Sequence, residues 1–140
     1  METKSRIQEK AHELFMRYGV RSVSMDDIAS NLGMSKKTIY QYFADKDELV
    51  DAVMDDEVNQ THTDCDFCKK NAKDAIDEIF LTMEQIQEQF SQLNPMVLYD
   101  IEKFHPHAFV KFKKMKDEYL QQVVAANIKR GIKEELYRAD

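Results

Sequence analysis

The chain has 140 residues, enough for one domain, or for one small domain and part of a second, without disulfide or metal support. Gly (3) and Pro (2) are scarce, 33% of the residues are charged and 43% are hydrophobic, which argues against a turn-rich β protein and favours long helices. The net charge of −6 arises in residues 51–140, because residues 1–50 contain eight basic and eight acidic residues. Overall acidity therefore does not exclude a nucleic-acid partner for the N-terminal part.

Cysteine usage and hydropathy indicate where the protein works. Cys65 and Cys68 are the only cysteines and lie three residues apart, so a disulfide framework of the secreted kind is excluded and a reducing compartment is favoured. The first 20 residues lack the apolar run of a signal peptide, and no window approaches ~18 consecutive apolar residues. We expect a soluble, cytoplasmic protein.

Three short helices are predicted first. An apolar stripe predicts a helix within residues 4–18 that Gly19 ends; its members are Ile7, Ala11, Leu14, Phe15 and Tyr18. Ser24 and Asp27 form a capping-box pattern that opens a second helix, which ends at Gly33. Ser35 is placed to cap a third helix over Lys36–Phe43.

Longer helices are predicted after residue 44. A second capping-box pattern at Asp45 and Glu48 opens a helix to about residue 60, and the polar, aperiodic stretch Thr61–Asp66 predicts a break or linker. Apolar periodicity then predicts a long amphipathic helix from about residue 72, and Asn94–Pro95 ends it and starts a shorter one through about Phe104. A last long helix runs from about His107 and closes at Gly131. The fold class is all-α.

The second and third helices have the form that major-groove recognition requires. Ile39 and Phe43 are four apart and can pack inward, which leaves the polar side chains between Lys36 and Tyr42 available. Lys suits phosphates and guanine edges, Gln suits adenine, Thr suits a phosphate or a thymine methyl, and Tyr hydroxyls suit phosphates. Composition alone fits a solvated amphipathic helix about equally well.

The run from Glu13 to Leu49, ELFMRYGVRSVSMDDIASNLGMSKKTIYQYFADKDEL, resembles the DNA-binding signature of the TetR family of transcriptional regulators. The resemblance implies that Ser24 and Tyr40 touch phosphates and that Tyr42 and Lys46 grip the DNA backbone. Further residues would contact base edges or flanking phosphates from the third helix and its cap. They are Ser35, Lys36, Lys37, Thr38 and Gln41. Two features depart from the common pattern of the family: Tyr42 stands where many members have His, and Asp26-Asp27 adds negative charge close to the DNA. Both affect which DNA sequence would be preferred, and neither affects the fold.

The resemblance also implies an organisation and a function. Residues 1–46 would form a three-helix helix-turn-helix domain, and residues 47–140 a helical ligand-binding and dimerisation domain that is C-terminally short, with its first helix as the connector. Residues 131–140 resemble the connector that precedes two further helices in the family. The implied function is that of a sequence-specific DNA-binding regulator in the bacterial cytoplasm: a homodimeric repressor on a palindromic double-stranded operator, released by a small apolar effector.

Aromatic and methionine residues of the second part are candidates for an effector pocket, because such side chains adapt to irregular apolar ligands. The candidates are Phe80, Met83, Met96, Tyr99, Phe104, Phe112 and Tyr119. At helical spacing a stripe of this kind is more often plain core, so both interpretations stay open for each residue.

Other chemistry is weakly supported. The side chains of His62, Cys65 and Cys68 suit zinc, but a structural zinc site needs four ligands. The Cys-x-x-Cys spacing suits a redox pair, but such a motif needs a βαβ context. We therefore favour a solvated loop that leads into a helix for this segment. His105-Pro106-His107 is interpreted as a loop between helices. Because no nucleophile–base arrangement or phosphate loop is present, we expect no enzyme activity, no metal and no cofactor. The competing class is a helical interaction module whose first part is only scaffold.

Overall fold

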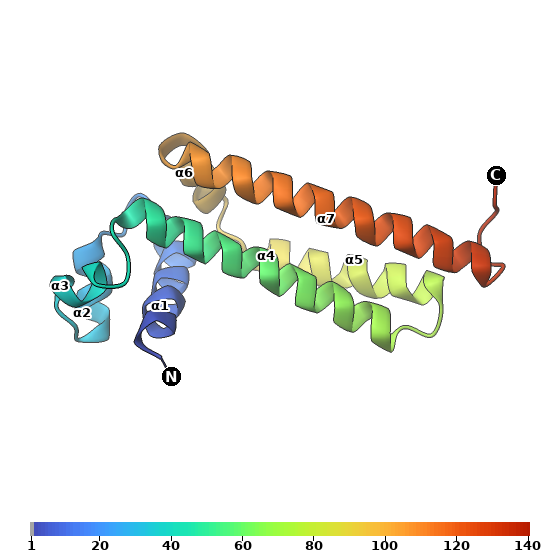
Figure 1. The fold of residues 1–140 in the computed structure, drawn as a ribbon, viewed down its shortest axis with the longest axis horizontal. Coiled ribbons are helices and arrows are strands. Elements are labelled where there is room, and N and C mark those ends of the chain that lie inside the picture. The colour runs from blue at the N-terminus through green and yellow to red at the C-terminus, as the bar shows by residue number, and fades with distance from the viewer. Residues whose placement is uncertain (1) are drawn as a thin grey trace. The chain divides into compact units, whose positions relative to one another are not determined.

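The computed structural model describes residues 2–140, apart from the side chain of Phe90. Over these residues the chain forms seven α-helices and no strand, which confirms the all-α prediction. The helices are α1 (Thr3–Tyr18), α2 (Met25–Leu32), α3 (Lys36–Tyr40), α4 (Lys46–Asn71), α5 (Ala75–Gln92), α6 (Pro95–Phe104) and α7 (Pro106–Lys133), and Figure 1 labels each of them. No helix in this described part is both long and apolar enough to cross a membrane.

The chain divides into two compact units. The first contains the chain up to Glu57 together with Leu93–Phe112, and the second contains Val58–Gln92 and Lys113–Asp140. Helices α4 and α7 each begin in the first unit and end in the second. The predicted boundary after residue 46 separates a DNA-binding domain from a regulatory domain by function, and it stays a prediction.

The first unit is built around one apolar cluster. Helix α1 contributes its predicted stripe, with Ile7 and Phe15 almost wholly buried, and Tyr18 is the one member that is exposed. Helix α6 adds Val97 and Ile101 from a distant part of the sequence. The other members of the cluster are Ala11, Leu14, Val20, Val23, Met25, Ile28, Ala29, Ile39, Phe43, Leu49, Val50, Val53, Met54 and Ala108.

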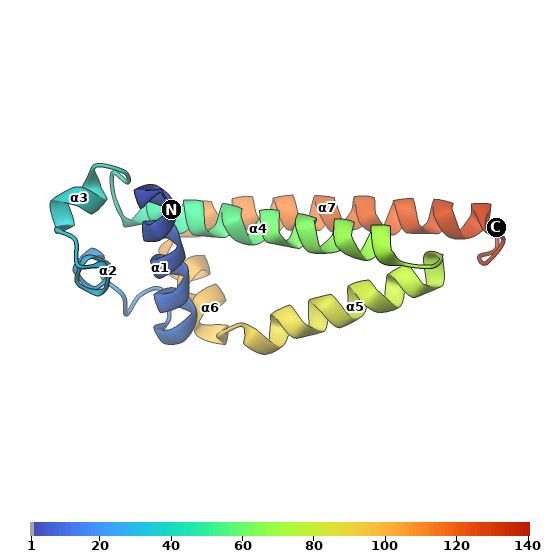
Figure 2. The same ribbon diagram turned by 90° about the horizontal axis from the view of Figure 1, so that it is seen from below.

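Hydrogen bonds between buried polar residues connect helices of the second unit. A turn over residues 72–74 reverses the chain, so that α5 runs antiparallel to the end of α4 (Figure 2). Glu78 of α5 and Asn127 of α7 are buried and hydrogen-bonded at 2.9 Å, and Arg130 donates to Glu78 at 2.9 Å. In contrast, Phe80 and Met83 are each 61% exposed. Helix α5 therefore buries the carboxylate of Glu78 while two of its large apolar side chains stay exposed.

Two predictions of local structure were wrong. The stretch Thr61–Asp66 is not a break, because α4 continues to Asn71, with the Gln60 amide donating to Asp64 and the Thr63 hydroxyl to the Asn59 carbonyl four residues away. Gly131 does not end α7, which continues to Lys133. Gly131 is instead the point where the Tyr137 ring lies against the helix, in the space that a Cβ would occupy.

Helix α7 ends in a Schellman motif. The Leu136 N–H donates to the Gly131 carbonyl at 2.8 Å and the Glu135 N–H to the Ile132 carbonyl at 3.0 Å. Glu135 takes the left-handed conformation with φ 63°, a position that glycine usually fills. The missing glycine signal explains why the sequence pattern placed the end of the helix too early.

Candidate nucleic-acid interface

Hydrogen bonds within a few residues fix the start of each short helix. The Ser24 hydroxyl accepts from the Asp27 N–H at 3.0 Å and the Asp27 carboxylate accepts from the Ser24 N–H at 2.9 Å, which is the predicted capping box. These bonds to Ser24 hold the pKa of Asp27 below its usual value. Ser35 accepts from the Thr38 N–H at 3.1 Å, and Gly33, with φ 67°, ends α2 in the left-handed conformation.

The turn at Gly33 places α3 against α2 with one face inward. Ile39 and Phe43 are buried as predicted, although α3 ends at Tyr40 and a hydrogen-bonded turn covers the remaining residues to Phe43. The predicted helix was therefore three residues too long. Helices α1, α2 and α3, called the reading head below, are shown in Figure 1.

Helix α3 and the residues that directly flank it contain most of the predicted DNA-binding residues. Lys37 and Gln41 are exposed, and the tyrosine side chains remain accessible, Tyr40 at 42% and Tyr42 at 38%. Thr38 is half-buried and its hydroxyl lies 2.9 Å from that of Ser35. Exposed hydroxyl, amide and ammonium groups on α3 and the turn after it form a surface able to hydrogen-bond to an anionic backbone and to base edges.

Two lysines of the predicted set already have partners. Lys36 forms an exposed ion pair with Asp26 at 3.5 Å, which links the first turns of α3 and α2. Lys46 is half-buried and its ammonium donates to the carbonyl oxygen of Val20 at 2.6 Å. Burial lowers the pKa of Lys46, and nearby carboxylates, of which Asp100 is the strongest, oppose that shift. Lys46 thus binds the turn between α1 and α2, a contact that its place in the sequence did not predict.

The candidate effector residues are divided between the two units. Met96, Tyr99, Phe104 and Phe112 belong to the first, and Phe112 packs against its core while the other three are exposed. Phe80, Met83 and Tyr119 belong to the second. There the Tyr119 ring stacks on His62 at 3.6 Å between centroids, and burial, with Asp66 nearby, raises the pKa of Tyr119 to about 12. An effector pocket built from this set stays a prediction.

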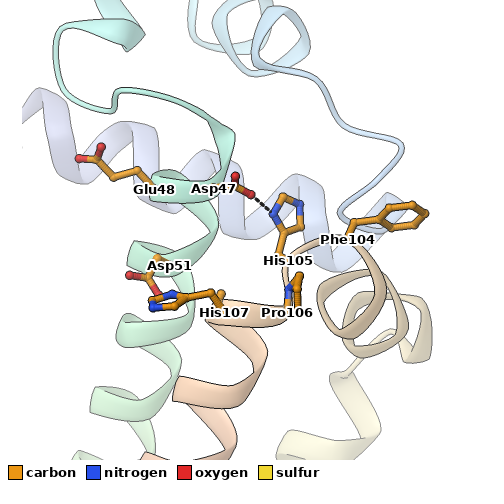
Figure 3. Close-up of a pocket in the computed structure, with 8 residues that line it drawn as sticks. Asp47, Glu48, Asp51, Phe104, His105, Pro106 and His107 are labelled. Carbon is orange, nitrogen blue, oxygen red and sulfur yellow. Dashed lines mark hydrogen bonds and ion pairs between the residues drawn. The ribbon is translucent and has the colours of Figure 1, made fainter.

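A cavity in the first unit is lined by both acidic and apolar residues (Figure 3). The first turns of α4 line it with Asp47, Glu48 and Asp51, and the junction of α6 and α7 lines it from Phe104 to Ala108. His105 contacts Asp47 through Nδ1. The predicted loop at His105-Pro106-His107 is a junction of one residue, since α6 ends at Phe104 and α7 begins at Pro106.

Over residues 2–140, no three His, Cys, Asp or Glu side chains converge so as to hold a metal ion. Cys65 and Cys68 are free thiols, and they are buried inside α4 rather than in a solvated loop, which corrects the favoured interpretation of that segment.

Residues 7–53, about a third of the chain, match the family described as bacterial regulatory proteins, tetR family. This N-terminal segment belongs to the TetR family. The match begins at the first buried residue of α1 and ends within α4, so it spans the whole helix-turn-helix and its packing against α1.

Curated relatives match over the TetR-family segment. A helix-turn-helix type transcriptional regulator of Staphylococcus aureus strain bovine RF122 is 41% identical over 59 residues, which cover 42% of this chain and 32% of that protein. Another, from strain USA300, is 46% identical over 48 residues, covering 34% of this chain and 26% of that protein. The matched part spans about a third or less of these relatives.

Solved structures extend the likeness to the whole fold. A transcriptional regulator from Cytophaga hutchinsonii superposes with a TM-score of 0.82 at 26% identity, covering 96% of this chain and 69% of the other. The TetR-family regulator PfmR from Thermus thermophilus gives 0.72 at 22% identity, covering 96% and 75%. The likeness to PfmR shows the fold alone, and it includes helices α5 to α7 beyond the TetR-family segment.

One residue near the interface escaped the sequence analysis. Asp100 of α6 is buried and accepts a hydrogen bond from the Arg21 N–H of the reading head at 3.0 Å. The signal in the sequence is an acidic residue within the apolar stripe formed by Val97 and Ile101, where a core residue is expected.

Proposed function

We propose that this chain is a sequence-specific DNA-binding transcriptional regulator, a repressor that acts as a homodimer on a palindromic operator. The observation that carries the proposal is that Lys37 and Tyr40 of α3 and the C-cap residue Gln41 are exposed while Ile39 is buried. A scaffold helix needs the buried residue but gains nothing from this set of exposed donors. The TetR-family match over residues 7–53 supports the same assignment.

Each side chain has a role in the proposed complex. Lys37 and Gln41 contact base edges or flanking phosphates, while Tyr40 and Tyr42 donate their hydroxyls to phosphates. The hydroxyls of Ser24 and Ser35 accept from backbone N–H groups as helix caps, and a hydroxyl that accepts can also donate its proton to a phosphate. The remaining proposed contacts are Lys36, Thr38 and Lys46.

We propose that a small apolar effector releases the DNA and that α4 transmits the change. Helix α4 begins next to the reading head, where Lys46 holds Val20, and it continues without a break to Asn71. An unbroken helix can carry a tilt from one end to the other, which a flexible linker at Thr61–Asp66 would not have done. The effector would contact the predicted pocket residues.

Binding to random-sequence duplex DNA across a salt series tests the proposal. The wild-type chain is compared with Lys37→Ala and with a control, Lys129→Ala, which removes an exposed lysine from α7. We expect Lys37→Ala to weaken binding and to reduce the slope of log affinity against log salt by about one, because one phosphate contact is lost. The control should match the wild type.

The mass of the chain in solution, measured on the same preparation, completes the test. Salt-dependent binding by a dimer would support the regulator and allow its operator to be selected from a random pool. A dimer that does not bind DNA at low salt would contradict the proposal and favour the alternative, a helical interaction module in which the reading head is scaffold.

A further inference from the structure

Asp100 places a buried carboxylate against the turn that joins α1 to α2. Asp100 is 3% exposed, and its Oδ2 accepts a hydrogen bond from the Arg21 N–H at 3.0 Å although the two residues are 79 positions apart. The same oxygen lies 3.0 Å from the point that a Cβ on Gly19 would occupy, and Gly19 has φ 86°. The carboxylate is thus fitted closely to the backbone of this turn.

The turn is held from a second direction by α4. The Lys46 ammonium donates to the Val20 carbonyl at 2.6 Å, between the two residues that Asp100 approaches. Asp100 also attracts the Lys46 charge. The backbone of Val20 and Arg21 is therefore hydrogen-bonded by side chains from two helices that lie outside the reading head, and one of these side chains, Asp100, also lies close to Gly19.

The position of the α1–α2 turn determines where the side chains of the proposed DNA interface lie. Three residues after Arg21, Ser24 caps α2, and the Lys36–Asp26 pair links the first turn of α2 to that of α3. A shift of the turn would move the Ser24 cap and, through α2, the exposed face of α3. DNA contacts require donors placed to within a fraction of an ångström, so such a shift lowers affinity.

A buried carboxylate is an expensive way to stabilise a helix contact. Burying a charge carries a desolvation penalty that its partners only partly offset, and an apolar side chain of similar size is often as stable or more so. Next to Val97 and Ile101, which are almost wholly buried, a leucine would suit the packing. The carboxylate provides directional hydrogen bonding to one backbone N–H, which leucine does not.

We propose that Asp100 is a positioning residue of the DNA-binding surface: from α6 it fixes the α1–α2 turn through Arg21 and thereby sets DNA affinity without touching DNA. This inference rests on the proposed function. It assigns to α6 a part in presenting a helix-turn-helix that lies more than 50 residues earlier in the chain.

The test compares three single variants with the wild type. Asp100→Leu keeps the size and removes the acceptor, Asp100→Asn keeps an acceptor oxygen and removes the charge, and Glu102→Gln makes the same charge change at an exposed position of α6. Each is titrated with random-sequence duplex DNA over a salt series, well below its melting temperature. Hydrogen exchange at the Arg21 amide is followed by NMR in the DNA-free chain.

We expect Asp100→Leu to exchange faster at Arg21 and to lose about tenfold or more in affinity with an unchanged salt slope, because no phosphate contact is removed. Asp100→Asn should recover to within about threefold of the wild type, and Glu102→Gln should match it. A residue that served stability alone would lower the melting temperature and leave the affinity of the folded variant unchanged.

Two results would overturn the inference in distinguishable ways. If the wild type binds DNA and Asp100→Leu binds it equally well, or if Asp100→Asn is as weak as Asp100→Leu, the positioning role fails and the proposed function survives. If the wild type itself does not bind DNA, the proposed function fails, and the role of Asp100 in DNA binding fails with it.

Discussion

His12 of α1 forms an ion pair with Glu57 of α4 when its imidazole is protonated, and we expect this pair to make the stability of the first unit depend on pH. The hydrogen bond to Glu57 is the main reason that the pKa of His12 is raised above its ordinary value of 6.5, and burial opposes it. A raised pKa in the folded state means that the imidazolium stabilises the fold fully below about pH 6.5, the ordinary value for the unfolded chain. That stabilisation is lost as the pH rises through the folded-state pKa.

Removing the imidazole should therefore lower the stability of the fold more at acidic than at basic pH. We expect the melting temperature of His12→Asn to lie below that of the wild type at about pH 6 and to approach it at about pH 9. The difference should be modest, because the His12 side chain is 43% exposed and solvent screens the pair. Glu57→Gln should abolish the same pH dependence; if that variant keeps it, Glu57 is not the cause.

Gly131 and Tyr137 form a second residue-scale contact, in the second unit. The Tyr137 hydroxyl donates to Asn127 Oδ1 at 2.9 Å and lies 3.2 Å from the Ala75 carbonyl, while its ring covers Gly131. Replacing a helical glycine by alanine ordinarily stabilises a helix by up to about 1 kcal/mol. Here the added methyl group would collide with the ring.

Gly131→Ala is therefore expected to lower the free energy of unfolding and not to raise it. We expect urea unfolding to show a loss of about 2 kcal/mol for Gly131→Ala, because the ring and its hydrogen bonds are displaced together. Tyr137→Phe, which keeps the ring and loses only the hydroxyl, should lose about 1 kcal/mol. A gain in stability for Gly131→Ala would mean that the ring does not lie on the helix in solution.

At the scale of the element, the continuity of α4 is tested by its two cysteines. Both side chains are buried, Cys65 at 7% and Cys68 at 4% exposure, and burial raises the pKa of both thiols. A thiol reacts as its thiolate, so a buried thiol with a raised pKa reacts slowly. In a solvated loop at Thr61–Asp66, Cys65 would react at nearly the rate of an unfolded chain.

We expect iodoacetamide at neutral pH to alkylate both thiols at least about tenfold more slowly in the native chain than in urea. Mass spectrometry of the two sites gives the rates separately, and the denatured chain is the control. Equal rates for Cys65 in the native and denatured chain would show that this part of α4 opens, and would restore the break expected from the sequence.

At the scale of the whole molecule, the two units differ in what they bury. The first contains the entire apolar cluster, whereas in the second the buried set includes Glu78 and Asn127, and large apolar side chains such as Phe80 and Val124 are exposed. Apolar burial is the main source of stability, so the two units should open with different free energies.

We expect amide hydrogen exchange to be slower in α1 and α6, which belong to the first unit, than in α5 of the second. Exchange measured by mass spectrometry on the isolated chain gives this comparison directly. Equal protection throughout would mean that the chain unfolds as one cooperative unit, and that polar contacts stabilise the second unit as strongly as apolar burial stabilises the first.

The sequence by itself determined what depends on near neighbours. The Ser24–Asp27 box, the Ser35 cap and the left-handed Gly33 involve residues within a few positions of one another, so their spacing was sufficient to predict them. The buried faces of α1 and α3 followed from periodicity for the same reason, and the dense TetR-like signature lies in this local part of the chain.

The tertiary structure decided what depends on distant partners. Cys65 and Cys68 belong to the buried face of a continuous helix because other helices of the second unit cover them, although the local pattern there is polar. Gly131 is a contact rather than a helix end because Tyr137 folds back on it, and Asp100 is buried because its acceptor meets a backbone N–H 79 residues away. Capping and periodicity are local properties, whereas the burial of a polar or small side chain depends on which partner the fold brings to it.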